Sequence, residues 1–221
     1  MILEKIENNE KLIKFKELVL KENEVMNLTS ITDEKEFLER HLFDSLTIVD
    51  YFDFKNKKVL DIGTGGGFPG IPLAICLPDT YFYLVETTVK KCLFLERVVK
   101  ILDLKNVKII NKRVEDLPFK YRSYFDFSVS RAVSQLNILL ELAIPYLKVN
   151  GKLIAYKGIK YQEELDVSKN ALNALSSSVE KIINEKLPFS NEPRFNIIIN
   201  KDMETNKNFP RLYSQIKKRP L

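Results

Sequence analysis

Several residue types that support a disulfide framework or a metal site are scarce in this chain of 221 residues. It has two cysteines, Cys76 and Cys92, and a single histidine. These residues do not supply the four clustered ligands of a structural zinc site. The two cysteines are typical of ordinary buried thiols in a reducing compartment. We therefore expect no disulfide bridge, no metal and a cytoplasmic location.

Long apolar runs are also missing. No uninterrupted apolar segment approaches the roughly 20 residues that span a bilayer. Residues 1–7 are charged and lack the apolar stretch of a secretory signal. Hydrophobic residues still make up 45% of the chain, so a sizeable core can form. The length fits one α/β domain with appendages, and nothing in the sequence demands a dimer, so we expect a monomer without a membrane anchor.

Hydrophobic periodicity predicts two N-terminal helices followed by alternating strands and helices. Such alternation implies right-handed crossovers and a mostly parallel sheet with helices on both faces. We predict a Rossmann-like α/β fold, with a helical extension at 1–55 that forms one compact unit with the domain at 56–221. Helices are expected at 3–22, 34–52, 69–77, 88–102, 134–147 and 161–175. Strands are expected at 58–62, 81–85, 107–110, 125–129, 152–156, 179–187 and 195–200, with the last two antiparallel to each other.

Glycine is scarce, with seven residues, yet five of them lie between Gly63 and Gly70. The first predicted strand carries Asp61 near its end, and Gly63, Gly65 and Gly67 follow at alternate positions. Glycines let a ligand approach the backbone closely because no Cβ intervenes. Loops at the carboxyl ends of parallel strands bind nucleotide-like cofactors. A G-x-G-x-G spacing after a strand-terminal acid favours S-adenosyl-L-methionine.

Two other interpretations of this loop stay open. A dinucleotide fingerprint, G-x-G-x-x-G, is present at Gly65, Gly67 and Gly70, but a lone match of this kind is weak. It would place Pro69 inside the phosphate loop, and proline lacks the backbone N–H that could hold a pyrophosphate. The second interpretation is a glycine turn that binds no ligand.

Polar residues at the ends of the following strands complete a candidate site. Glu86 ends the second predicted strand, where a carboxylate can accept both hydroxyls of a ribose. The alternative role for Glu86 is to stabilise the start of the next helix through its dipole. Val114 and Glu115 follow the third strand, where an adenine ring could lie. Arg131 and Lys157 end the next two strands, where the acceptor usually meets the methyl group in this architecture.

Segment 61–74, DIGTGGGFPGIPLA, closely resembles the bacterial small-subunit rRNA guanine-N7 methyltransferases, once called glucose-inhibited division protein B. Further matches follow the same order along the chain, at 27–29, 40–46, 113–115, 130–132 and 156–158. The resemblance implies a Rossmann-like methyltransferase that uses S-adenosyl-L-methionine on a guanine of 16S rRNA. The partner would be 16S rRNA or a precursor of the small ribosomal subunit.

The resemblance also implies roles for individual residues. It carries cofactor contacts onto Gly63, Phe68, Val114, Glu115 and Arg131, which join Asp61, Gly65 and Glu86 from the strand-and-loop pattern. It suggests substrate-positioning roles for His41, Lys157 and Arg194, although a lone histidine beside leucines is more often a hydrogen-bonded structural residue. One departure is visible, because the family usually has a histidine after the arginine and this chain has Phe195 there.

Guanine N7 carries a free lone pair at neutral pH, so methyl transfer to it needs orientation and no general base. We expect Lys157 or Arg131 to engage guanine O6 or a phosphate and to leave N7 open. Residues 186–221 hold eight Lys and Arg against three Asp and Glu. This basic tail suits RNA or simply aids solubility, and removal of residues 211–221 tests which by the salt dependence of RNA binding.

Three other functions stay open at this point. The chain could be an S-adenosylmethionine-dependent transferase acting on a small molecule or a protein. It could be a noncatalytic RNA-binding protein that keeps the cofactor fold. A dinucleotide-dependent oxidoreductase is the most distant alternative.

Overall fold

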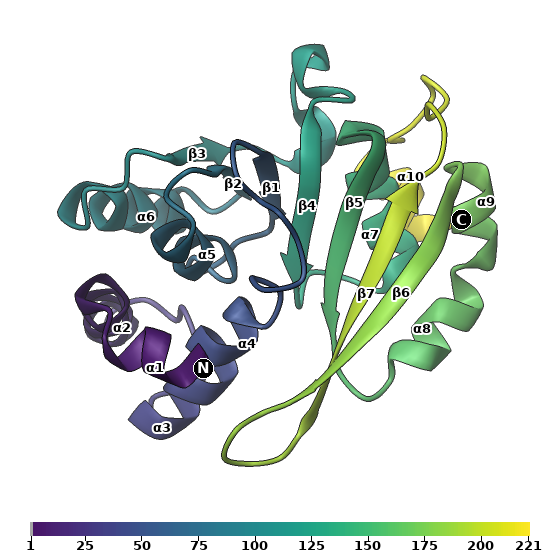
Figure 1. Cartoon of the computed structure of the whole chain (residues 1–221). Coiled ribbons are helices and arrows are strands. Elements are labelled where there is room, and N and C mark those ends of the chain that lie inside the picture. The colour runs from purple at the N-terminus through teal and green to yellow at the C-terminus, as the bar shows by residue number, and fades with distance from the viewer. Residues whose placement is uncertain (1) are drawn as a thin grey trace.

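The computed structural model describes residues 2–221 and contains a seven-stranded sheet with helices on both faces (Figure 1). The strand order is β3-β2-β1-β4-β5-β7-β6. The first five strands of this order are parallel, and β7 runs antiparallel to both β5 and β6. The predicted Rossmann-like α/β fold is confirmed. The strands are β1 Lys58–Ile62, β2 Tyr81–Glu86, β3 Val107–Asn111, β4 Phe125–Arg131, β5 Leu147–Lys157, β6 Ser177–Lys186 and β7 Pro193–Lys201.

Two hydrophobic cores lie on the two faces of the sheet. Val59 of β1 belongs to the first core and Leu60 to the second, because successive strand residues point to opposite faces. The first core is covered by α1 Ile2–Glu7, α2 Glu10–Asn23, α3 Glu34–Phe37, the π-helix η1 Leu38–Phe43, α4 Asp44–Leu46, α5 Gly70–Cys76 and α6 Val89–Ile101. The second is covered by η2 Val114–Asp116, η3 Phe119–Tyr121, α7 Leu136–Ala143, η4 Ile144–Tyr146, α8 Tyr161–Val167, α9 Lys169–Ala174 and α10 Tyr213–Lys218.

The N-terminal helices share the first core with the sheet. Ile6 of α1, Phe15 of α2 and Phe37 of α3 are buried in the same cluster as Phe82 of β2. Figure 1 shows α1 to α4 gathered on the side of the sheet that carries α5 and α6. Met1, the first residue of the predicted extension, lies outside the described residues. The extension therefore contributes to the packing behind the candidate site.

The structure corrects two predicted helices near the N-terminus. The helix expected at 3–22 is divided after α1, because the side chain of Asn9 accepts hydrogen bonds from the amides of Lys11 and Leu12 and starts α2. The helix expected at 34–52 ends at Leu46 and passes through the π-helical segment η1. Hydrophobic periodicity alone does not reveal either feature, because the first depends on a side-chain cap and the second on a shift in the backbone hydrogen bonds.

Four later elements also differ from expectation. The helix expected at 161–175 is divided into α8 and α9 at Ser168, whose hydroxyl donates to the Glu164 carbonyl at 2.6 Å. The helix expected at 134–147 is α7 followed by a 3₁₀ turn, because Pro145 cannot continue an α-helical ladder. Strand β5 begins at Leu147 and accommodates Asn150 in a positive-φ conformation within an irregular segment beside β4. Helix α10 was not predicted, because its short sequence reads as a charged tail. Among residues 2–221, no helix is both long and apolar enough to cross a membrane.

Candidate active site

The glycine loop connects β1 to α5 through a backbone that only glycine adopts readily. Gly63, Gly65 and Gly67 have φ angles of 67°, 58° and 101°. Asp61 fastens the end of the loop, since its Oδ2 accepts a hydrogen bond from the amide of Gly70 at 2.9 Å. A Cβ at Gly70 would lie 2.5 Å from that same oxygen. The spacing of acid and glycines therefore fixes the path of the backbone.

Asp61 acts on the loop from inside the protein. Its side chain is fully buried, and its Oδ1 has no hydrogen-bond partner within the described residues. Burial raises the pKa of Asp61 to about 7. The residue lines neither of the cavities described below. In this structure Asp61 positions the loop that a ligand would meet.

The first of two neighbouring cavities lies at the carboxyl ends of β1, β2 and β3 and is here called the glycine-loop cavity. It has a volume of about 180 Å³. Strand ends of a parallel sheet converge at one edge, which explains why residues far apart in sequence meet here. Its wall includes Gly63, Glu86, Arg113, Val114, Glu115 and Tyr213.

Glu86 connects this cavity to the glycine loop. Its Oε2 accepts a hydrogen bond from the Gly65 amide at 3.1 Å, and its Oε1 accepts one from the Thr88 amide at 2.8 Å. Burial opposes ionisation of Glu86, but these hydrogen bonds and the charge of Lys91 outweigh burial and lower the pKa of the carboxyl. Glu86 therefore presents a charged acceptor at the cavity while it also supports the start of α6.

Glu115 offers an acceptor that the protein itself does not satisfy. Its Oε1 is buried and has no hydrogen-bond partner within the described residues, and Arg113 lies 3.9 Å from it. Burial raises the pKa of this carboxyl. Buried polar atoms are nearly always paired in folded proteins. An unpaired acceptor in a cavity wall is a place where a ligand N–H or O–H can bind.

The second cavity, here called the arginine cavity, has a volume of about 540 Å³. It shares Val133 with the glycine-loop cavity, so the two adjoin. Three of its wall residues come from the π-helix and the residue that follows it. In this segment the Asp44 amide donates to the Glu39 carbonyl, five residues back, and such wide turns often occur at functional sites. The charged and aromatic wall residues are Arg40, His41, Asp44, Arg131, Tyr156, Lys157, Glu164 and Arg194.

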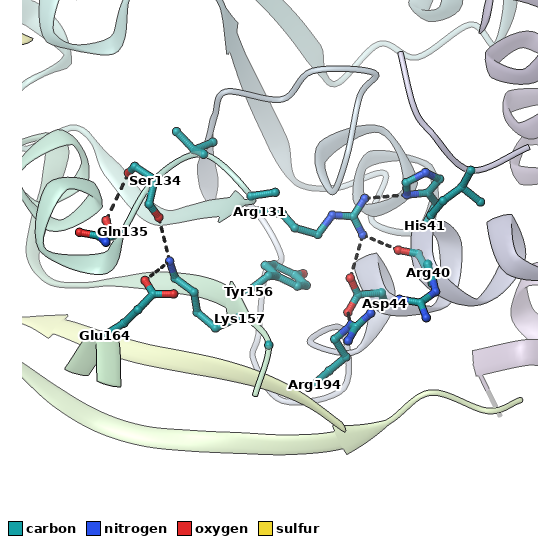
Figure 2. Close-up of a pocket in the computed structure, with 14 residues that line it drawn as sticks. Arg40, His41, Asp44, Arg131, Ser134, Gln135, Tyr156, Lys157, Glu164 and Arg194 are labelled. Carbon is teal, nitrogen blue, oxygen red and sulfur yellow. Dashed lines mark hydrogen bonds and ion pairs between the residues drawn. The ribbon is translucent and has the colours of Figure 1, made fainter. Parts of the chain in front are cut away.

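Arg131 organises one side of the arginine cavity (Figure 2). From the end of β4 its guanidinium donates to Asp44 Oδ2 and to the Arg40 carbonyl, each at 2.9 Å. It also donates to His41 Nδ1 at 3.2 Å and lies 5.2 Å from the centre of the Phe68 ring. The side chains of Arg131 and Asp44 are 13% and 5% exposed, so this is a largely desolvated ion pair. It joins the sheet to the N-terminal helices.

His41 is held as a neutral ring. Because a guanidinium can only donate, Nδ1 accepts from Arg131 and the ring proton resides on Nε2, 2.7 Å from Thr29 Oγ1. Burial and the charge of Arg131 lower the pKa of His41 to about 3. The ring also stacks on Phe68 with centroids 4.4 Å apart. Both ring nitrogens are therefore occupied by contacts within the protein.

The other cations of the arginine cavity also have carboxylate partners. Lys157 Nζ donates to Glu164 Oε2 at 2.6 Å and to the Ser134 carbonyl at 2.9 Å (Figure 2). Arg194 donates to Glu192 at 2.6 Å, and its Nε lies 3.6 Å from Asp44 Oδ1. An ammonium has three N–H donors, so one donor of Lys157 has no partner among these contacts. Cations held in this way are oriented before a substrate arrives.

A model of the family described as rRNA small subunit methyltransferase G matches residues 8–192. The chain belongs to this family. A Caldicellulosiruptor bescii protein named ribosomal RNA small subunit methyltransferase G is 40% identical over 216 residues, which covers 95% of this chain and 91% of that protein. A Fusobacterium nucleatum protein of the same name is 42% identical over 212 residues, covering 96% and 91%.

Solved structures show the same fold as this rRNA small subunit methyltransferase G family member at low sequence identity. A SAM-dependent methyltransferase from Aquifex aeolicus is 21% identical with a TM-score of 0.59, covering 76% of this chain and 94% of that one. TYW2 from M. jannaschii, solved in complex with AdoMet, is 17% identical with a TM-score of 0.59 and covers 77% of each chain.

In this family member, the residues singled out from the sequence divide between the two cavities. Gly63, Glu86, Val114 and Glu115 line the glycine-loop cavity. His41, Arg131, Lys157 and Arg194 line the arginine cavity. Asp61, Gly65 and Phe68 line neither cavity.

Sequence reasoning gave no role to several residues that complete these walls. Asp44 lies inside the matching segment 40–46, so the resemblance could have found it. Glu164 and Tyr213 carry no motif, and only the fold brings them to the cavities. Among the described residues, no group of three or more His, Cys, Asp and Glu side chains could hold a metal ion.

Proposed function

We propose that the protein transfers the methyl group of S-adenosyl-L-methionine to N7 of a guanine in 16S rRNA. Membership of the rRNA small subunit methyltransferase G family supports the reaction class. The two adjoining cavities support a division of labour, with the cofactor's adenosyl half in the glycine-loop cavity and the guanine in the arginine cavity.

The residues around the glycine-loop cavity fit this cofactor. Glu86 would accept from the ribose hydroxyls, and the unpaired Glu115 Oε1 would accept from the adenine side. Gly63 lines this cavity, and its missing Cβ makes room for Val133, whose Cγ2 would lie 2.5 Å from a Cβ there. When bound, the sulfonium supplies an activated methyl group. No phosphate needs to be held here, which agrees with a loop whose proline lacks an N–H.

The arginine cavity suits a nucleic acid. Its wall carries four cationic side chains, from three arginines and Lys157, against the two carboxylates of Asp44 and Glu164, while His41 is neutral. Glu36 and Glu192, outside the wall, pair with Arg40 and Arg194, so the cations are balanced in charge and held in fixed positions. Guanidinium and ammonium N–H groups held in this way can donate to phosphate oxygens. The volume of about 540 Å³ falls within the usual range for ligand pockets and leaves room for a base.

The observation that carries the choice of acceptor atom is that the described wall residues able to take a proton are already engaged by other groups. Glu164 Oε2 accepts from Lys157 at 2.6 Å and from the Leu136 amide at 2.8 Å. His41 Nδ1 is already occupied by Arg131, and the pKa of its ring is about 3. Tyr156 donates its hydroxyl proton to the Ser45 carbonyl at 2.8 Å, and burial raises its pKa well above the ordinary value. Asp44 is held between two guanidinium groups. Guanine N7 needs no base, since its lone pair is free at neutral pH.

Lys157 and Arg131 would orient the guanine through its O6 or a neighbouring phosphate. Each already rests on a carboxylate, so it can donate a remaining N–H without leaving its position. A cation on N7 itself would block the reaction. Holding the nucleophile in line with the methyl group can contribute up to about 7–11 kcal/mol of the barrier.

The test is incubation with methyl-labelled S-adenosyl-L-methionine and, separately, small ribosomal subunits, free 16S rRNA and total protein, all from cells that lack this protein. We expect label in RNA that digests to 7-methylguanosine. The subunit and free-RNA arms show which form of the substrate is used. Label in another nucleoside, in protein only, or nowhere would overturn the proposal.

A further inference from the structure

The end of the chain is an ordered segment that returns across the second core. It is here called the C-terminal strap, residues 202–221. Lys201, the last residue of β7, immediately precedes it, is fully buried and donates from Nζ to the Leu147 carbonyl at 2.7 Å. Arg122 then donates to the carbonyl oxygens of Thr205 and Asn206 at 2.9 and 2.8 Å. Two cations therefore fix the first turn of a segment whose composition suggested a loose tail.

The second half of the C-terminal strap is fixed to α7. Glu141 is fully buried, and its carboxylate accepts three hydrogen bonds from Arg211: from the backbone amide at 2.9 Å, Nε at 2.8 Å and a terminal nitrogen at 2.6 Å. Ile216 of α10 is fully buried in the second core. Figure 1 shows α10 beside α7. The position of α10 is thus set by a buried ion pair and an apolar anchor.

Tyr213, the first residue of α10, forms part of the wall of the glycine-loop cavity. It lies there with Glu115 and Leu142, and the guanidinium of Arg113 is 5.1 Å from the centre of its ring. The ring is partly exposed and packs against the second core. An aromatic ring in a cavity, beside a carboxylate oxygen that has no hydrogen-bond partner, supplies the flat apolar surface that a purine requires.

We propose that Tyr213 binds the adenosyl half of the cofactor, so that the C-terminal strap is part of the cofactor site. This inference rests on the proposed function, because it takes the glycine-loop cavity as the adenosyl site. The ring is held in place before binding by Arg113 and by the anchors of α10. Binding therefore immobilises little additional side chain, which favours affinity.

The first test measures the Kd of S-adenosylhomocysteine and of 5′-methylthioadenosine by calorimetry. Tyr213→Ala should raise both Kd values about tenfold, the order found when a base loses an aromatic contact. Tyr213→Phe should stay within about twofold of the wild type, since the ring remains. Ser214→Ala, at an exposed position of the same helix, is the matched control and should change neither value.

The outcomes separate the two proposals. Wild-type binding of both ligands with no loss in Tyr213→Ala overturns the role of Tyr213 and leaves the proposed function intact. No binding by the wild type overturns both. A loss for S-adenosylhomocysteine alone would place Tyr213 against the amino-acid half and would also overturn the inference.

A second measurement covers the case in which Tyr213→Ala does not fold. The chain has no tryptophan, so Tyr213→Trp introduces a single indole at the cavity wall. Its emission should change as S-adenosylhomocysteine saturates the protein, whereas Ser214→Trp should not respond. Equal responses from the two variants, or none from either, would overturn the role of Tyr213.

Discussion

The two cavities differ in how the sequence builds them. The glycine-loop cavity is made mostly from residues 62–115, at the ends of three strands that follow one another along the chain. The arginine cavity combines residues from 31–44, 131–135, 156–164 and Arg194. The glycine-loop cavity is the product of a local strand–loop–helix pattern. The arginine cavity forms only when the N-terminal helices pack against the sheet.

The chemistry of the two cavities differs in the same way. The glycine-loop cavity presents the acceptors Glu86 and Glu115, which suit the hydroxyl and amino groups of a nucleoside. The arginine cavity presents guanidinium and ammonium groups that carboxylates hold in place, and in the proposed function their remaining N–H groups orient the guanine. Mutations in the glycine-loop cavity should therefore change the affinity for the cofactor, and mutations in the arginine cavity should change the rate of methyl transfer to rRNA.

The largest effect on stability is expected from Arg131→Ala, which removes the ion pair between the sheet and the N-terminal helices. It leaves the buried Asp44 carboxylate without its partner at 2.9 Å, and removing one member of a buried pair costs about 3–5 kcal/mol. Urea unfolding should show a loss of that size. Arg97→Ala removes an exposed pair with Glu22 and should cost no more than about 1 kcal/mol. Equal losses in the two variants would refute a structural role for the Arg131 pair.

Asp61 should give the next largest effect, through pH. The folded protein keeps the Asp61 proton up to about pH 7, whereas the unfolded carboxyl releases it near 3.8. The folded state therefore binds more protons between these values, and its stability falls as pH rises. Asp61→Asn removes this loss. From pH 5 to pH 8, the free energy of unfolding of the wild type should therefore fall by about 2–3 kcal/mol more than that of the variant. Urea unfolding at each pH measures this, and the same pH dependence of unfolding free energy in the wild type and the variant would contradict the raised pKa of Asp61.

A pair of variants sharpens the comparison between the cavities. Glu86→Gln should raise the Kd of S-adenosyl-L-methionine by about tenfold, because a charged acceptor contributes about 1–3 kcal/mol. Lys157→Ala should leave that Kd within about twofold and lower kcat/KM for rRNA by about tenfold or more. Glu163→Gln, exposed on α8, is the control for both assays. If both variants changed the same quantity, the division of labour would be wrong.

The smallest effect concerns RNA affinity. Removal of residues 211–221 would also remove Tyr213 and the buried Ile216, so truncation does not isolate the charge of the tail. Replacement of the exposed Lys217 and Lys218 by serine leaves these anchors in place. If both lysines meet phosphates, the slope of log K against log salt should flatten by about 0.7 for each. An unchanged slope would assign these lysines to solubility.

The sequence predicted the parts of the molecule that depend on local rules. The order of strands and helices and the glycine loop follow from hydrophobic period and residue spacing, and Gly63 and Glu86 line one cavity. The end of the second predicted helix could not be found in this way, since the π-helical segment before Asp44 depends on shifted backbone hydrogen bonds that periodicity does not encode.

Long-range pairs account for most of what the sequence did not show. Arg131 and Asp44 are 87 residues apart, and Arg211 and Glu141 are 70 apart. No periodicity couples such positions, because their pairing is decided by how the helices pack on the sheet. The C-terminal strap illustrates this, since its basic composition concealed a helix held by one buried carboxylate.

The most direct test of the account is the crystal structure of the protein with S-adenosylhomocysteine. We predict the adenosine between Glu86, Glu115 and Tyr213, with the homocysteine sulfur directed past Val133 toward the arginine cavity. A nucleoside bound in the arginine cavity, or a glycine-loop cavity that stays closed by its own side chains at saturating ligand, would contradict the account.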